Sequence, residues 1–273
     1  MYLFRNLRND LNIIDGFLLT NMLRNIRPNW NILRKNFNQP HVHFNCDSLG
    51  IFPVQSVGNN DFISSYNNLP LDPYVDENYP PKRLRRYAQV RVDVSDPENF
   101  VIHLVDKDIF HQDVLDYRGI PRIFERIEPK VIQSRWLTDF IGQISAASIL
   151  LENDKRQTCI YNNPINSLTV DIHQVRQVAY PGEESHNSPE GIHRDGADYV
   201  VSAFVLNRLN VEGGDSVVYD SEKNQIYKTT LKDGLGIFQE DRELWHYVSG
   251  ISSVGDRMGF RDIIGLDITI DAS

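Results

Sequence analysis

The spacing of apolar positions separates an N-terminal part with helical periodicity from a C-terminal part in which apolar and polar residues alternate. Apolar residues recur at helical spacing over residues 11–36, and Pro28 breaks or restarts this pattern. Residues 37–85 are rich in Asn, Pro, Asp and Gly, a composition that favours irregular loops. Residues 132–151 fit an amphipathic helix. We therefore expect two helical segments, both ahead of the part that is richest in strands.

Strand signals begin at Tyr87 and dominate after residue 165. Alternation predicts strands over 87–92, 101–105, 168–179, 198–207, 215–220, 225–231, 235–239, 244–249 and 260–270. Because turns rich in Gly, Asp and Asn separate these short strands, the pattern indicates a mainly β fold of the sandwich or barrel type. We expect an irregular and helical N-terminal region, residues 1–85, packed on a β core with a supporting helix, residues 86–273.

Composition and charge narrow the class of protein. The chain of 273 residues has a formal net charge of -9, which disfavours nucleic acid or an anionic membrane as its main partner. Cys46 and Cys159 are too few and too far apart for a disulfide framework or a zinc knuckle, so we expect two reduced thiols. No apolar run is long enough to span a bilayer, and residues 1–10 lack the features of a signal peptide. We expect a cytoplasmic protein.

A short basic run, Lys82-Arg83-Leu84-Arg85-Arg86, precedes the first expected strand of the β core. Such a run is typical of a solvated face or of a set of ion pairs with neighbouring carboxylates. Capture of an anionic ligand is the alternative interpretation.

A candidate metal site is centred on His193 and Asp195. Residues two apart at a strand end point to the same face, so this imidazole and this carboxylate can bind one metal ion. Gly196 lets the chain turn directly after them. His246, in the apolar segment 244–248, is the natural third ligand. Two histidines and one carboxylate form a facial triad that leaves positions open for a co-substrate and O2, as in non-haem Fe(II) oxygenases.

Other interpretations of these histidines are open. A single histidine on an apolar strand is more often a core residue with a hydrogen-bond partner than a ligand. The pair His41-x-His43 is the only rival metal motif, but it falls in the segment expected to be a loop and has no nearby Asp in a strand pattern.

Arg261 begins the last expected strand. A guanidinium entering a buried strand requires an anion, and its planar fork fits a carboxylate such as the distal carboxylate of 2-oxoglutarate. Arg257 is the competing residue, although it lies in a turn where an arginine can remain solvated. Alternatively, Arg261 pairs with a protein carboxylate such as Asp262 or Asp267.

Four separate motifs resemble one known family. Pro189–Gly196 looks like the iron-binding signature of the Fe(II)/2-oxoglutarate-dependent dioxygenases related to bacterial L-isoleucine dioxygenase. Gly213–Tyr219 resembles the Gly-Gly-Glu-Ser strand of that family, Trp245–Val248 its second-histidine strand, and Gly259–Asp262 its terminal Arg-Asp strand. The resemblance covers about residues 85–270.

The resemblance implies a double-stranded β-helix of the jelly-roll, cupin-like type. It also implies Fe(II), 2-oxoglutarate and O2 as cofactor and co-substrates, and hydroxylation of an unactivated C–H bond of a free amino acid or a close derivative. By position, His193, Asp195 and His246 take the roles of iron ligands, and Arg261 that of the 2-oxoglutarate anchor. The pair Ala197-Asp198 departs from the family pattern, which changes the expected rim of the pocket and hence the substrate.

Two further expectations concern the substrate. Segment 171–178 is unusually polar for a strand, so one face could line the site, with Gln174 or Arg176 meeting the carboxylate of the substrate. The alternative is that these residues face solvent or a sheet edge. Besides a small-molecule hydroxylase, the same motifs allow a hydroxylase of protein or peptide side chains, or a non-enzymatic member of the fold that binds a metal or a ligand.

Overall fold

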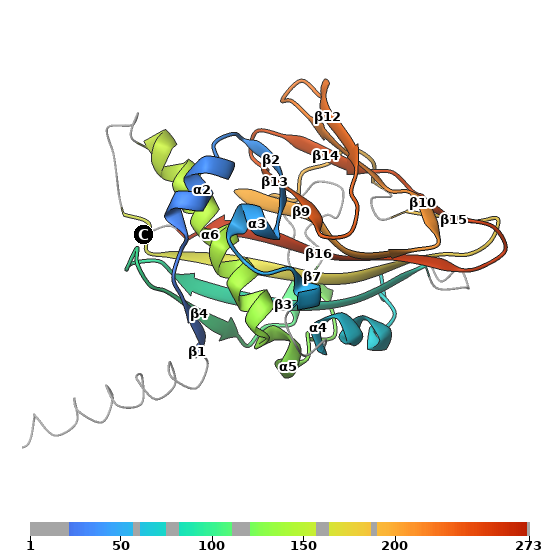
Figure 1. Ribbon diagram of the computed structural model, residues 1–273, viewed down its shortest axis with the longest axis horizontal. Helices are drawn as coiled ribbons and strands as arrows, with labels where there is room; N and C mark the ends of the chain where they lie inside the picture. The colour runs from blue at the N-terminus through green and yellow to red at the C-terminus, as the bar shows by residue number, and fades with distance from the viewer. Residues whose placement is uncertain are drawn as a thin grey trace, which may run out of the picture.

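A large antiparallel sheet of eight strands organises the molecule (Figure 1). The computed structural model describes residues 22–56, 61–74, 82–110, 121–156, 164–186 and 190–271. In spatial order the strands of this large sheet are β1 (Met22–Ile26), β4 (Phe100–Val105), β3 (Arg83–Asp93), β7 (Ser167–Ala179), β16 (Gly259–Ile270), β9 (Tyr199–Leu209), β13 (Leu235–Glu240) and β2 (His41–Asn45).

Smaller sheets cover one face of the large sheet. Three of their strands pair in the order β10 (Val211–Gly213), β15 (Ile251–Ser253) and β8 (Glu184–Ser185), and three in the order β12 (Gln225–Thr230), β11 (Asp215–Tyr219) and β14 (Trp245–Val248). A short ribbon pairs β5 (Ile109–Phe110) with β6 (Arg122–Ile123). Apolar side chains of the large sheet, such as Val205 and Ile263, pack with Val218 and Leu244 in the layer between. This layering is consistent with the jelly roll that the sequence motifs imply.

The long helix α6 (Arg135–Arg156) lies across the opposite face of the large sheet (Figure 1). Its aromatic side chains meet the sheet at Phe204, whose ring centroid lies 5.7 Å from that of Trp136 and 5.1 Å from that of Phe140. The helix expected over 132–151 is thus confirmed, although it begins after a separate short helix, α5 (Pro129–Ile132). None of the helices in the described part of the chain combines the length and apolar character that crossing a bilayer requires.

The expectation of helical structure over residues 11–36 is confirmed only after Pro28 and is wrong for residues 22–26. Residues 11–21 lie outside the described part of the chain, and residues 22–26 form β1, an edge strand paired with β4. Helix α2 (Trp30–Asn36) starts only after Pro28. In residues 22–26, backbone hydrogen bonds to the edge of the sheet outweigh a weak helical periodicity. Local helix propensity is a small effect that tertiary contacts commonly override.

The segment expected to be irregular contains more regular structure than its composition indicates. The strand β2 pairs with β13 and closes one edge of the large sheet, so His41 and His43 lie in a strand and not in a loop. The helices α3 (Cys46–Leu49) and α4 (Asp61–Ser64) and the 3-10 turns η1 (Val54–Ser56) and η2 (Ser65–Asn68) follow. Cys46 is a buried free thiol, and Cys159 lies outside the described residues. The division at residue 85 remains a prediction.

The strands expected after residue 165 are confirmed, with bounds that shift by a few residues at most. The pairing of β9 with both of its neighbours contains an irregularity between Val201 and Ala203. Such a bulge re-aims the side chains beside it. Here it accompanies a change of face, because Val201 packs toward α6 whereas Ala203 packs toward the smaller sheets.

Candidate metal centre

Backbone pairing brings His193 and His246 side by side. Each residue donates its backbone N–H to the carbonyl of the other, at 3.0 and 2.9 Å, so the loop that carries His193 is held against β14. The two imidazole centroids lie 4.3 Å apart. Gly191 and Gly196 border this loop with φ angles of +82° and +88°, a backbone region that favours glycine.

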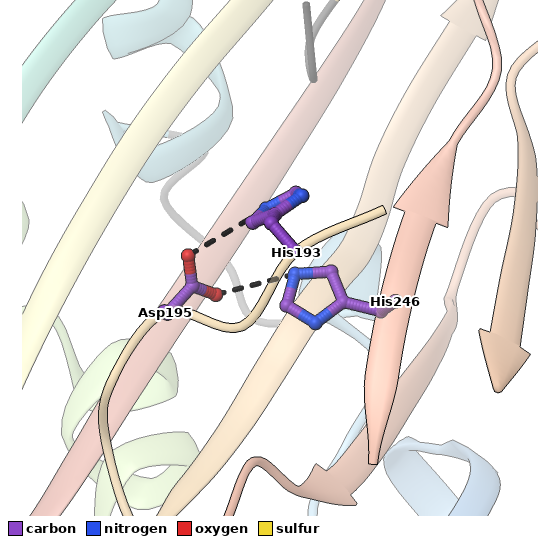
Figure 2. Close-up of side chains that lie close together, drawn as sticks. All are labelled: His193, Asp195 and His246. Atoms are coloured by element: carbon purple, nitrogen blue, oxygen red, sulfur yellow. Dashed lines mark ion pairs between the residues drawn. The ribbon is translucent and has the colours of Figure 1, made fainter. Parts of the chain in front are cut away.

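Asp195 completes a compact group of three side chains (Figure 2). Its two carboxylate oxygens lie 3.7 Å from Nε2 of His193 and 3.3 Å from Nε2 of His246. One ligand atom from each residue falls within a group no wider than 4.8 Å, and this is the only such group of three or more among the described residues. The pair His41 and His43 belongs to no such group, so the rival metal motif has no structural support in this part of the chain.

Hydrogen bonds at the far side of each imidazole determine whether Nε2 can bind a metal. His193 Nδ1 lies 2.9 Å from the carbonyl oxygen of Gly191, so Nδ1–H donates and Nε2 keeps its lone pair. His246 Nδ1 lies 3.2 Å from the amide nitrogen of Gln239, whose buried amide oxygen has no partner among the described residues. Rotating this amide by half a turn lets the oxygen accept Nδ1–H of His246, which leaves Nε2 free as well.

The electrostatics of this group suit a cation. Burial alone would raise the pKa of Asp195, but His246, followed by His193, holds that pKa well below its ordinary value. Burial alone would lower the pKa of His246, but the charge and hydrogen bond of Asp195, together with the charges of Asp241 and Asp267, raise that pKa to about 9. A second carboxylate borders the site, because Glu190 lies 3.2 Å from Nε2 of His193. Positive charge is therefore favoured between these side chains, and a divalent ion satisfies the same demand as protons.

The guanidinium of Arg261 is fully buried and only partly satisfied. Its Nη1 donates to the carbonyl of Gly214 at 3.1 Å, whereas Nε and Nη2 have no hydrogen-bond partner among the described residues. Burial, followed by the repulsion from Arg208, lowers the pKa of Arg261 to about 9. A Cβ at Gly214 would lie 2.5 Å from Nη1, so the glycine makes room for the guanidinium. A buried guanidinium with N–H groups that lack acceptors is suited to bind an anionic ligand.

The alternative partners of Arg261 are engaged elsewhere. Asp262 pairs with Arg176 at 2.6 and 2.8 Å, and Asp267 hydrogen-bonds to His173 at 2.9 Å. The competing Arg257 lies in an exposed turn. Neither carboxylate therefore serves as a counter-ion to Arg261.

The expected roles of Gln174 and Arg176 at the substrate are wrong. Gln174 donates to Ser65, and the guanidinium of Arg176 is committed to Asp262, so neither lines the pocket. The intervening residues of β7 line it instead, because side chains alternate between the two faces of a strand. The full lining consists of Arg83, Arg85, Phe110, Arg122, His173, Val175, Glu190, His193, Asp195, Val201, Ser202, His246, Val248, Ile263, Gly265 and Asp267. The polarity of segment 171–178 indicated that this strand lines the site. Because its side chains alternate between two faces, the sequence did not show which face does so.

Comparison with known proteins identifies a family whose sequence pattern matches this chain. The family model described as 2OG-Fe dioxygenase matches residues 63–267. The enzyme 3(1)-hydroxy-L-isoleucine 4-dioxygenase from Pantoea ananatis (strain AJ13355) is 29% identical over 156 residues, which are 56% of this chain and 57% of that protein. The chain thus spans little more than half the length of this curated relative.

Solved structures show the same fold at low sequence identity. A BsmA homologue from Methylobium petroleophilum PM1 aligns with a TM-score of 0.71 and 19% identity, over 89% of this chain and 94% of that one. IDO from Bacillus thuringiensis aligns with a TM-score of 0.64 and 18% identity, over 89% and 99%. The Fe(II)/α-ketoglutarate-dependent dioxygenase TqaL aligns with a TM-score of 0.62 and 13% identity, over 89% and 87%.

These likenesses confirm the double-stranded β-helix that the motifs imply. The matched region, residues 63–267, contains the whole group of His193, Asp195 and His246 as well as Arg261. On the strength of that match, the chain belongs to the 2OG-Fe dioxygenase family, whose members use Fe(II), 2-oxoglutarate and O2.

Proposed function

We propose that the protein is an Fe(II)- and 2-oxoglutarate-dependent dioxygenase that hydroxylates an unactivated C–H bond of a free amino acid or a close derivative. The balanced reaction converts the substrate, 2-oxoglutarate and O2 into the hydroxylated product, succinate and CO2. The observation that carries the proposal is the convergence of His193, Asp195 and His246 on one point of a polar pocket.

In this proposal the three side chains hold the metal from one side. Both imidazoles offer Nε2, and Asp195 offers a carboxylate oxygen, a donor set that fits Fe(II) and leaves positions open for the co-substrate and O2. When bound, the metal supplies the activation of O2 and the oxidation of the C–H bond. The remaining work of the chain is to aim Nε2 of His193 and of His246 at the metal, which Gly191 and Gln239 do by contacting Nδ1 on the far side of each ring.

Arg261 is proposed to bind the distal carboxylate of 2-oxoglutarate. Its Nε and Nη2 are buried and have no hydrogen-bond partner in the described part of the chain, so a planar carboxylate can accept from both without displacing a bond seen there. The carbonyl of Gly214 fixes the orientation of the guanidinium through Nη1. A small molecule bound here gains a strong interaction because the surroundings exclude water.

The substrate class is inferred from a relative and from the charges that line the pocket. The curated relative is named for a dioxygenase that acts on a hydroxylated isoleucine, and the alignment covers 56% of this chain. A pocket lined by both cationic and anionic side chains also suits a zwitterion.

The experiment is a panel of free amino acids, including L-isoleucine and its hydroxylated derivatives, incubated with Fe(II), 2-oxoglutarate and O2. We expect one or more of them to raise succinate release above the level without substrate, with one hydroxylated product formed per succinate. Asp195→Ala is the inactive reference, and His43→Ala is the matched control because His43 is exposed on β2.

The possible failures are distinguishable. Succinate release that no amino acid stimulates would remove the amino-acid substrate but leave the dioxygenase, and a peptide library would then be the next panel. A protein that neither binds iron nor decarboxylates 2-oxoglutarate would be a non-enzymatic member of the family.

A further inference from the structure

The basic run 82–86, at the start of β3, contains one cation that has no carboxylate partner among the described residues. The others form ion pairs, Lys82 with Glu183, Arg83 with Asp72 and Arg86 with Glu125, at 2.9, 2.7 and 3.1 Å. Arg85 has no carboxylate within 4.0 Å among the described residues, and its Nε is buried without a hydrogen-bond partner. Of the two interpretations of this run, ion pairing therefore accounts for every cation except Arg85.

Arg85 lies on the wall of the same pocket that contains the metal-binding group. The pocket is lined by Arg85 and Arg122 from one side of the fold and by His193, Asp195 and His246 from another. Burial, followed by repulsion from Arg83, lowers the pKa of Arg85 to about 10, so the side chain stays charged at neutral pH. A half-buried cation without a counter-ion is costly to the fold unless a ligand supplies the charge.

A hydrogen-bonded chain holds this guanidinium in place. Because arginine only donates, Nη2 of Arg85 donates to Nδ1 of His173 at 2.6 Å. The other ring nitrogen of His173 must then carry the proton, and it donates to Asp267 at 2.9 Å. The imidazole is also clamped by the rings of Phe110 and Tyr87, at centroid distances of 4.8 and 5.6 Å. Hydrogen bonds on both ring nitrogens, the one to Asp267 fully buried, make this a rigid support for the guanidinium.

Aromatic rings define the rest of this wall. The guanidinium carbon of Arg85 lies 4.3 Å from the ring centroid of Phe124 and 5.8 Å from that of Phe110. The guanidinium of Arg122 lies 4.9 Å from the same Phe110 ring. Two cations beside one ring repel each other, so an anion bound between or beside them lowers the energy of both.

We propose that Arg85, oriented by His173 and Asp267, binds the carboxylate of the substrate. This inference rests on the proposed function and specifies how that function selects its substrate. Arg261 does not line this pocket and is supported by Gly214, so two separate arginines serve two different carboxylates. With its carboxylate at Arg85, an amino acid directs its side chain, and not its carboxyl end, toward His193, Asp195 and His246. His173 and Asp267 act as positioning residues.

The test compares the binding of a carboxylate with that of its amide in the wild type and in variants of Arg85. Anaerobic calorimetry of the Fe(II)- and 2-oxoglutarate-loaded protein measures the affinity for the most active amino acid of the panel and for its carboxamide. The wild type is expected to bind the acid about ten- to a hundredfold more tightly than the carboxamide. Arg85→Gln should bind both equally weakly and should keep its affinity for 2-oxoglutarate. Arg85→Lys should recover part of the preference, because it restores the charge without the fork.

The control is Arg91→Gln, an exposed arginine on the same strand, which should behave as the wild type. Equal binding of acid and carboxamide by the wild type would overturn the inference. Loss of 2-oxoglutarate affinity in Arg85→Gln would also overturn it, because Arg85 would then serve the co-substrate.

The inference can also fail or survive independently of the amino-acid proposal. If no amino acid stimulates succinate release, the same calorimetry is carried out with butanoate and butanamide as probes. A preference for butanoate that Arg85→Gln abolishes supports the carboxylate subsite, and absence of any preference overturns it.

Discussion

The two faces of the large sheet are formed by the same strands but hold different chemistry. Toward α6, β7 and β16 contribute side chains with no exposed surface, namely Leu168, Val170, Ile172, Ile264, Leu266 and Ile268. Toward the smaller sheets, the intervening positions of these strands include His173, Asp267 and Arg261. Nε and Nη2 of Arg261 lack a hydrogen-bond partner among the described residues. Because both faces are buried, burial alone does not mark the functional one.

The two faces differ in the interactions of their buried side chains. On the α6 face, apolar side chains pack against one another, so their contacts contribute to stability. On the opposite face, buried nitrogen atoms of Arg261 and the charged Arg85 have no anionic partner among the described residues, which costs stability and suits them to bind anionic ligands. The two faces should therefore respond differently to substitution.

Removal of a metal ligand should have the largest effect. His246→Ala deletes one of three side chains in the candidate metal centre and should lower succinate release by more than about 100-fold, which exceeds the usual cost of disturbing an outer partner of a ligand. The thermal unfolding temperature of the metal-free protein should change little, because the metal-centre face contributes less packing. Retained activity would show that His246 is not a ligand.

Truncation on the α6 face should act on stability instead. Phe140 is fully buried against Trp136 and Phe204, so Phe140→Ala should reduce the free energy of unfolding by about 3–5 kcal/mol. Denaturant titration measures this change. Iron bound per folded chain should be unaltered, and a loss of iron binding in the folded variant would contradict the separation of the two faces.

Replacement of Arg261 should act on one co-substrate only. Arg261→Leu removes the cation proposed to bind 2-oxoglutarate and should raise the KM for 2-oxoglutarate about ten- to a hundredfold while leaving iron affinity unchanged. Arg257→Ala is the matched control, because Arg257 lies in an exposed turn. Steady-state succinate assays at varied 2-oxoglutarate distinguish the two variants, and an unaltered KM in Arg261→Leu would exclude this role.

The smallest effect is expected at Gln239, which contacts His246 from behind. Gln239→Leu keeps the side-chain volume but removes the hydrogen-bond partner of Nδ1, so iron affinity should fall about tenfold. Gln239→Glu should restore most of it, because a carboxylate also accepts Nδ1–H. Competition with a metal chelator measures both variants, and equal affinities of wild type and Gln239→Leu would show that the contact does not orient the ring.

The sequence predicts those parts of the fold that have strong local patterns. The strand expected at 168–179 matches β7 to within one residue, because Leu168, Val170 and Ile172 alternate with polar residues at its start. Residues 22–26 do not carry such a pattern, and only pairing with β4 makes them a strand. The same applies to β2, whose partner β13 lies almost 200 residues away in the chain.

The residues of the candidate site likewise include some that the sequence predicts and some that it does not. His193, Asp195 and His246 could be selected from spacing, because His-x-Asp is local and the later histidine interrupts an apolar strand. The chain of Arg85, His173 and Asp267 could not, because it depends on the register of β3, β7 and β16. In sequence, His173 has no motif, and Arg85 is one of several cations in a basic run. Residues that act through hydrogen bonds between strands are visible only after the strands are paired.

The central claim is that His193, Asp195 and His246 hold one catalytic iron. Anaerobic equilibrium dialysis against Fe(II), with iron determined per chain, tests it without requiring the substrate. The account predicts about one iron per chain for the wild type, bound more tightly when 2-oxoglutarate is present, and almost none for Asp195→Ala at the same free Fe(II). Equal iron content in the wild type and Asp195→Ala, or no bound iron in either, would contradict it.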